Sequence, residues 1–277
     1  IALTYVTANL NPTPSDVRAT LMTSDPARFE AIKAHDLNIL VQPYLYIGIV
    51  ILILLIAIRL TKMPKASDEG GEEKSLWTAV KQLSKVKNYR EGVIAQFFYV
   101  GAQTVCWAYI VYYGHHVFHD LDGMADKAAD QLTTRFYLTA LALFAIGRFV
   151  FTGFLKFVKP GKLLSVISIG AIVLLCGVIF ADGKPGLYCL VAVSGCMSLM
   201  FPTIYGIALN GLKENVKFGS AGLIMSILGG SVIPPIQAAI MDVKGDVLGL
   251  SSMNFSFFVP FICFAVIAIY GFRSLKN

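Results

Sequence analysis

Long apolar segments alternate with short polar ones along most of this chain. A helix of about 20 apolar residues matches the roughly 30 Å hydrocarbon core of a bilayer. Seven segments have this length and character, so the pattern predicts an all-α integral membrane protein. The predicted spans lie at about 39–60, 90–114, 132–157, 163–181, 187–210, 220–241 and 254–271.

The polar segments carry the connections. Residues 1–10 resemble the last turns of a helix, and residues 11–38 form a polar, proline-containing loop. Residues 61–89 contain the acidic run SDEGGEEK and then the amphipathic stretch LWTAVKQLSKVKN, for which a surface helix and a solvated linker both stay open. Because the first residue is Ile and no signal peptide precedes the loop, we expect a fragment of a longer chain.

Composition supports a membrane protein, and the charges predict its orientation. Hydrophobic residues make up 56% of the chain and charged residues 14%, with a mean hydropathy of +0.68. One set of connections, which includes the linker at 61–89 and the carboxyl-terminal tail, holds 16 of the 23 Lys and Arg but 6 of the 17 acids. An excess of Lys and Arg marks the cytoplasmic side. We therefore expect the carboxyl terminus in the cytoplasm.

The span at 90–114 has a polar face. At about 100° per residue, Gln96, Gln103 and Trp107 fall within a narrow arc, and Tyr99 lies about one side chain away. An unpartnered amide in hydrocarbon costs several kcal/mol, so this face points at protein, water or a polar ligand. Amides that grip hydroxyls and an indole that covers a pyranose ring suit a sugar. Hydrogen bonding to neighbouring helices is the alternative.

Helix breakers interrupt two of the spans. Pro202 lies inside 187–210, whereas Gly229, Gly230, Pro234 and Pro235 lie inside 220–241. In lipid, such positions persist only where protein or a water-lined cavity satisfies the freed carbonyls. We expect these residues to act as hinges of a moving transporter, with kinked packing as the simpler alternative.

The remaining polar residues argue against other classes of site. His115, His116 and His119 cluster in one connection, but such spacing at an exposed helix end is usually incidental, so we expect no functional metal and no cofactor. The last span has no Lys for a retinal Schiff base, and the spans carry no motif of an intramembrane enzyme. No mid-span Asp or Glu is present to carry a coupling proton, so such a group would lie outside this chain.

Three stretches carry a resemblance to a known family. They are AQFFYVGAQTVCWAYIVYYG, FAIGRFVFTGFLKFVKPGKLL and MFPTIYGIALNGLKENVKFGSAGLIMSILGGSVIPPI. Together they resemble the carboxyl-terminal half of bacterial L-fucose–proton symporters, in the fucose/galactose/glucose branch of the major facilitator superfamily. The resemblance runs from about residue 39 to 272. It implies two six-helix halves around a central cavity.

On that scheme, the chain divides into four parts. Residues 1–38 hold the end of a helix and an external loop, 39–60 the last helix of the amino-terminal bundle, 61–89 the cytoplasmic linker and 90–277 the carboxyl-terminal six-helix bundle. The resemblance implies a bacterial inner-membrane carrier that takes up a monosaccharide with protons and works as a monomer with its amino-terminal half. No nucleic-acid partner is expected, and the runner-up is a major facilitator carrier of a drug or organic ion.

The resemblance also implies residues of the substrate site. Cavity aromatics of the family correspond to Trp107, Phe144 and Phe201. Fucose symporters tend to have Tyr where this chain has Phe201, immediately before Pro-Thr-Ile. This departure leaves L-fucose, galactose, glucose and other hexoses open as the substrate. The family's substrate-binding and proton-carrying acids lie in its amino-terminal half.

Overall fold

A computed structural model describes residues 9–11, 13, 15–60, 76–212, 215–243, 245 and 247–275, and all regular elements in these ranges are helices. The predicted helix end at 1–8 and the acidic part of the linker at 61–75 lie outside the described residues. The elements are α2 (Ser15–Ser24), α3 (Pro26–Leu60), α4 (Leu76–Lys85), α5 (Lys87–His115), the π-helix η1 (His116–Leu121), α6 (Asp126–Phe154), α7 (Pro160–Phe180), α8 (Lys184–Met197), α9 (Met200–Leu209), α10 (Val216–Met225), the 3-10 helix η3 (Ser226–Leu228), α11 (Gly229–Met241), α12 (Ser252–Ser256) and α13 (Phe258–Ser274).

Seven helical segments of the described chain are long and apolar enough to cross a membrane, which confirms the predicted all-α membrane fold. Three of them correspond to the single helices α3, α6 and α7, and a fourth consists of α5 and the π-helix η1 that continues it. The other three are composite, because α8 and α9, α10 and α11, and α12 and α13 each follow one another within a single span. The amphipathic part of the linker is helical as well, in α4.

The polar loop predicted for residues 11–38 is the main error in the sequence-based assignment. Helix α2 and the first third of α3 occupy most of this range. Pro26 stands at the first position of α3, where a proline loses no helical hydrogen bond and its fixed φ suits a helix start. Pro26, which the sequence analysis assigned to a loop, therefore begins a helix. Arg18 and Asp36 join the two helices by an ion pair of 2.7 Å.

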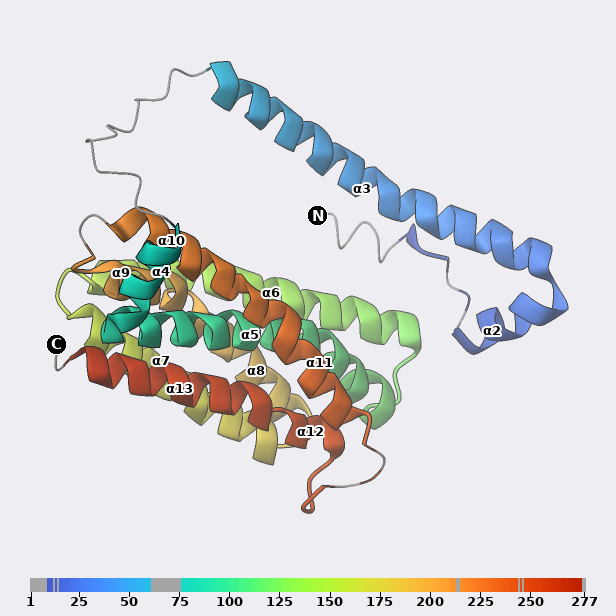
Figure 1. Ribbon diagram of the computed structural model, residues 1–277. Coiled ribbons are helices and arrows are strands. Elements are labelled where there is room, and N and C mark those ends of the chain that lie inside the picture. The colour runs from blue at the N-terminus through green and yellow to red at the C-terminus, as the bar shows by residue number, and fades with distance from the viewer. Residues whose placement is uncertain are drawn as a thin grey trace.

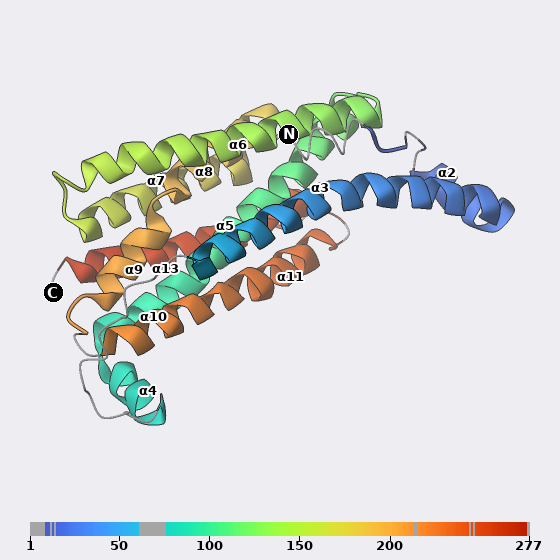
Figure 2. The ribbon, with the colours of Figure 1, turned by 90° about the horizontal axis from the view of Figure 1, so that it is seen from above.

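Helix α5 forms the centre of the bundle. It packs against α6, α8, α9, α11 and α13, and Figure 2 shows it between α6 on one side and α11 on the other. Among its large side chains, Tyr99, Ile110 and Tyr113 are fully buried. Of the polar face predicted for this helix, Gln96 is buried and Gln103 and Trp107 are half-buried.

Helix α3 differs from the bundle helices in its exposure. Only 6% of its apolar window is buried, and Figure 1 shows the helix lying apart from the bundle. A long apolar helix with so little buried surface needs a cover of lipid or of other membrane helices. The bundle from α5 to α13 is thus the packed core of the described chain.

Two glycines allow α5 and α11 to approach closely. A Cβ at Gly101 of α5 would overlap the side chain of Ile233, and a Cβ at Gly229 of α11 would overlap the backbone carbonyl of Phe97. Small residues serve this purpose in membrane helices, where association depends on close packing rather than on burial from water.

Candidate functional site

The polar face of α5 contains buried groups that lack partners. Gln96 is fully buried, and neither its Oε1 nor its Nε2 has a hydrogen-bond partner in the described chain. The indole Nε1 of Trp107, three turns further along the same face, is also buried and unpartnered. Gln103 is half-buried between them. Since most buried polar groups in proteins are hydrogen-bonded, the amide of Gln96 and the indole N–H of Trp107 are left with unmet hydrogen-bonding capacity.

Unpartnered hydroxyls occur on the neighbouring helix as well. Ser194 lies in α8 and Ser198 directly follows that helix, and the Oγ atoms of both are buried without a partner in the described chain. Helix α8 packs against both α5 and α6. These two serines were not recognised in the sequence, because a small hydroxyl residue in an apolar run is common in membrane helices and signals little by itself.

The aromatic residues predicted for the site meet in two groups. Trp107 and Phe144 form a T-shaped pair with ring centroids 5.0 Å apart. Phe201 lies 6.1 Å from Tyr99 and 6.4 Å from Tyr205, onto which it stacks. Of the predicted aromatic residues, the structure therefore brings Trp107 of α5 to Phe144 of α6, and Tyr99 of α5 to Phe201 of α9. Tyr205 was missed in the sequence, although its spacing of four residues from Phe201 places both on one helix face.

The break between α8 and α9 leaves two carbonyl groups for side chains to satisfy. Pro202 has no N–H to donate to the carbonyl of Ser198, and the Nε of Arg148 donates to that oxygen instead, at 3.2 Å. The hydroxyl of Tyr99 donates to the carbonyl of Met197 at 2.9 Å. Arg148 also lies over the Phe144 ring, 5.3 Å from its centroid. Thus protein groups satisfy the broken backbone, as the proline in this span predicts.

Pro202 itself does not mark the point of the break. The helix is interrupted at residues 198–199, and Pro202 lies in the first turn of α9, where proline is tolerated. In the span of α10 and α11, a 3-10 turn at Ser226–Leu228 immediately precedes Gly229 and Gly230. Pro234 and Pro235 lie inside α11. The five hinge candidates thus follow two interruptions of helical geometry, and their movement stays a prediction.

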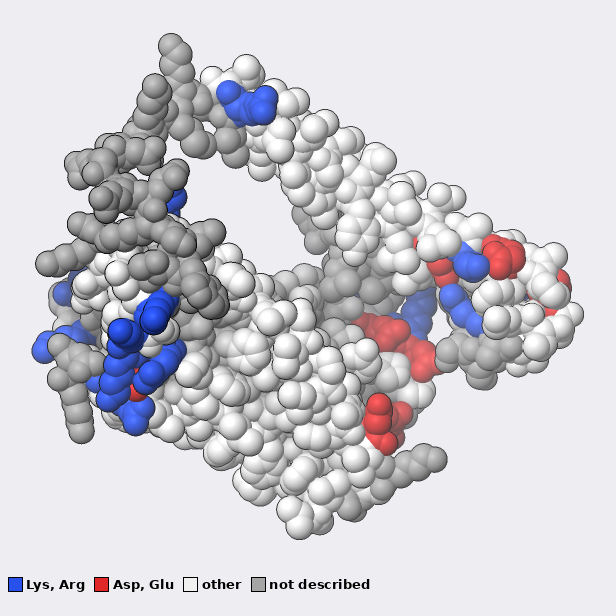
Figure 3. All heavy atoms as spheres, viewed as in Figure 1, with Lys and Arg blue, Asp and Glu red and all other residues white. Residues whose placement is uncertain are grey.

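Charges separate along the bundle. In Figure 3, Lys and Arg gather at the end of the bundle where Figure 1 shows the C-terminus, and Asp and Glu gather at the opposite end. Residues of the first end include Arg90, Lys159, Lys162 and Arg273, and those of the second include Asp120, Asp126, Asp130 and Asp242. The basic end carries the connections in which the sequence concentrates Lys and Arg, and the acidic end carries the others.

Comparisons with known proteins extend these observations. The sequence is 45% identical to an L-fucose-proton symporter of Haemophilus influenzae over the whole of this chain and 63% of the relative. It is 33% identical to an L-fucose-proton symporter of Escherichia coli, over 96% of this chain and 58% of the relative. A glucose/galactose transporter of Brucella abortus is 29% identical, over 85% of this chain and 53% of the relative. No protein-family model matches the sequence.

Solved structures show the same likeness. The chain superimposes on a crystal structure of the Escherichia coli fucose:proton symporter FucP, a single-residue variant, with a TM-score of 0.74 and 28% identity. The match covers 97% of this chain and 62% of FucP. A second structure, of FucP in the outward conformation, agrees with the same TM-score and coverage. The chain spans about 60% of the length of the relatives it matches.

The helical bundle and its likeness to FucP define the class of protein: this chain has the fold of a major facilitator superfamily transporter. The likeness is not confined to the fold, since identity reaches 45% over the entire chain. Within that superfamily, the chain belongs to the L-fucose–proton symporter family.

Proposed function

We propose that the protein formed by this chain is a secondary active transporter that takes up a monosaccharide together with protons, by alternating access. The named activities of its relatives support this proposal, since they are L-fucose-proton symporters and glucose/galactose transporters. Their bacterial sources and the seven candidate spans support a multi-pass protein of the bacterial inner membrane. The excess of Lys and Arg at the C-terminal end of the bundle supports a cytoplasmic carboxyl terminus.

The observation that carries the proposal is the unpartnered amide of Gln96. Burying an amide without hydrogen bonds costs roughly 1–3 kcal/mol in proteins, so the position needs a compensating partner. A sugar hydroxyl both donates and accepts, and it can therefore satisfy the Oε1 and the Nε2 of a Gln. A mostly apolar drug would leave this amide unsatisfied.

We propose a substrate site formed by Gln96, Tyr99, Gln103, Trp107, Phe144 and Phe201. In it, the amides of α5 bind hydroxyl groups while Trp107 covers the apolar face of the sugar ring. Phe144 holds the indole edge-on from α6, at 5.0 Å between ring centroids. Helices that the relatives carry beyond the matched stretch complete the cavity and supply the proton carrier, and the complete protein works as a monomer.

The test measures sugar binding and uptake by the complete protein in proteoliposomes. Trp107→Ala is expected to weaken binding of the transported sugar by about 1–3 kcal/mol, with expression close to normal. The matched control is Tyr112→Ala, because Tyr112 lies in the same helix but is 61% exposed. Uptake is compared among L-fucose, galactose, glucose and a lipophilic cation, with and without a proton gradient.

Two results would contradict the proposal. Uptake of the lipophilic cation without uptake of any hexose would assign the carrier to drugs or organic ions. Unchanged sugar affinity in a Trp107→Ala protein that unfolds more readily would identify Trp107 as a packing residue.

A further inference from the structure

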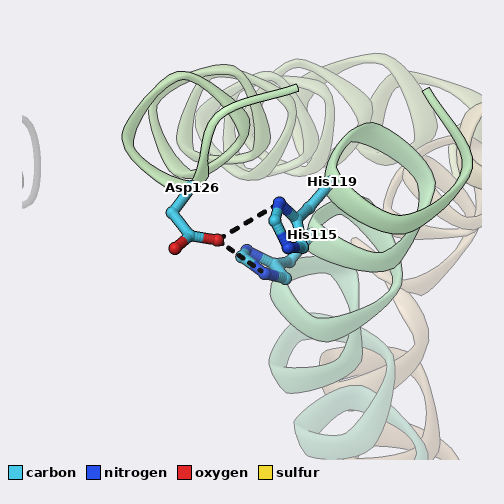
Figure 4. Close-up of side chains that lie close together, drawn as sticks. All are labelled: His115, His119 and Asp126. Atoms are coloured by element: carbon cyan, nitrogen blue, oxygen red, sulfur yellow. Dashed lines mark ion pairs between the residues drawn. The ribbon is translucent and has the colours of Figure 1, made fainter. Parts of the chain in front are cut away.

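A group of histidine and aspartate side chains lies at the end of the bundle opposite the Lys- and Arg-rich end. His115 is the last residue of α5, His119 lies in η1 and Asp126 is the first residue of α6. Figure 4 shows the two imidazole rings and the carboxylate facing one another across the connection between these helices. One nitrogen of each ring and one carboxylate oxygen all lie within 4.8 Å of one another.

The distances suit a small cation with short bonds. The Oδ1 of Asp126 lies 3.2 Å from Nδ1 of His119 and 4.0 Å from Nε2 of His115. Ligands of a tetrahedral Zn²⁺ at bond lengths near 2.0 Å are about 3.3 Å apart. The first of these separations already has this length. The second separation and the distance between the two ring nitrogens, which is at most 4.8 Å, must shorten when a metal binds.

A second carboxylate orients His115 for metal binding. Nδ1 of His115 and Oδ1 of Asp130 are 2.9 Å apart, so in neutral His115 the Nδ1–H donates to Asp130. The lone pair is then on Nε2, which faces Asp126. Metal-bound histidines usually donate their other N–H to a carboxylate or carbonyl in this way. Without a proton or a cation between them, this lone pair and the Asp126 oxygen would repel each other.

His119 is arranged differently, because the nitrogen that faces Asp126, Nδ1, is also the one that bonds a backbone carbonyl. Its Nδ1 lies 2.9 Å from the carbonyl of Met124, and its Nε2 lies 3.9 Å from Oδ1 of Asp120. Ligation through Nδ1 would move the ring proton to Nε2, where Asp120 faces it. The hydrogen bond to Met124 would be released.

We propose that His115, His119 and Asp126 bind a divalent first-row transition metal of the Zn²⁺ type, with water at the open position. Imidazole ligands favour Zn²⁺, Cu²⁺ and Ni²⁺, whereas Mg²⁺ and Ca²⁺ prefer oxygen. Bound metal joins the C-terminal end of α5 and η1 to the first turn of α6, and so fixes the connection between two spans. The site lies outside the hydrocarbon, because α5 and η1 together have 35 residues and about 20 suffice to span it.

This inference replaces the expectation of no metal that the histidine spacing suggested. The spacing brought in His116, but the structure directs its Nδ1 to Asp120 at 2.7 Å and leaves it outside the group. The ligand and orienting carboxylates from α6 stand 7 and 11 residues beyond His119, so the sequence pattern did not connect them with it. A π-helix at this place is a further sign of function, because π-helical turns are frequent at functional sites.

The test uses protein purified through a tag without histidine, in detergent, with Zn²⁺ alone as the ligand and Mg²⁺ as the competing ion. Equilibrium binding is expected to give one zinc per chain and a rise in the thermal unfolding temperature, since a ligand that binds the folded state stabilises it. His115→Ala, His119→Ala and Asp126→Asn are each expected to weaken binding at least about 100-fold and to abolish the rise. Asp130→Asn is expected to weaken binding about 10–100-fold, because it removes the orienting carboxylate.

The matched control is His116→Ala, which is expected to bind zinc as the unmodified protein does. The unfolding temperature of each variant without zinc, together with its elution as a single species, separates lost ligands from lost folding. The proposal is overturned if zinc does not bind at millimolar concentration, if Mg²⁺ competes equally, or if His116→Ala weakens binding as much as His119→Ala. These outcomes are independent of sugar transport.

Discussion

Substitution of Gly229 by Ala tests how closely α5 and α11 approach in the membrane. The added Cβ would overlap the backbone carbonyl of Phe97, which cannot rotate away as a side chain would. Overpacking costs about 1–3 kcal/mol, and the rigid neighbour places this contact near about 3 kcal/mol. The change from Gly to Ala inside a helix returns about 1 kcal/mol. The net destabilisation is therefore about 2 kcal/mol.

The adjacent glycine offers the matched control. A Cβ at Gly230 would meet the Thr104 hydroxyl at 2.9 Å and a Val100 methyl at 3.2 Å, both side-chain groups that can shift. We estimate a cost of about 1 kcal/mol, which the helix propensity of Ala offsets. Gly230→Ala is therefore expected to unfold near the temperature of the unmodified protein.

The assay is thermal unfolding of the purified protein in one detergent. At about 2–4 °C per kcal/mol for a chain of this size, Gly229→Ala is expected to unfold roughly 4–8 °C lower than Gly230→Ala. Equal unfolding temperatures for the two variants would refute the reasoning. They would show that α5 and α11 are further apart in the membrane than the structure places them.

Two further variants test the broken helices. Tyr99→Phe removes the donor to the Met197 carbonyl and is expected to destabilise the protein by about 1–2 kcal/mol in the same unfolding assay, and no loss of stability would mean that water or another group satisfies this oxygen. Pro234→Ala combined with Pro235→Ala restores two backbone N–H donors within α11 and so makes this helix harder to bend. The double variant is therefore expected to slow sugar counterflow more than it weakens sugar binding. Lost affinity at a normal exchange rate would instead assign these prolines to packing or direct contact.

The spans could be predicted from the sequence because their signal is local. Hydrophobic length is set by the bilayer, and each of the seven predicted spans overlaps one of the seven membrane-length helical segments of the described chain. The start of α3 could not be found in this way, since residues 26–38 are polar and lie outside the apolar window. Pro26 indicated a loop there, although proline is equally suited to the first turn of a helix.

The candidate site was only partly predictable, for a related reason. The periodicity of one helix placed Gln96, Gln103 and Trp107 on one face, because positions along a helix follow from its geometry. Nothing local indicated that Arg148 would donate to the carbonyl of Ser198, 50 residues away. Partners contributed by other helices depend on how the bundle packs. The periodicity of a single sequence does not reveal that packing.

The central position of α5 has a consequence for biosynthesis. This helix precedes every other helix of its bundle in the chain, yet it is the one that they surround. About 80 residues separate its end from the end of α8, which takes roughly 4–16 s to translate at about 5–20 residues per second. During that interval α5 lacks the later neighbours α8, α9, α11 and α13, which pack against it in the finished bundle, where Gln96 is fully buried. The emerging α5 therefore needs a temporary polar contact, at the translocon or with earlier helices, until its permanent neighbours arrive.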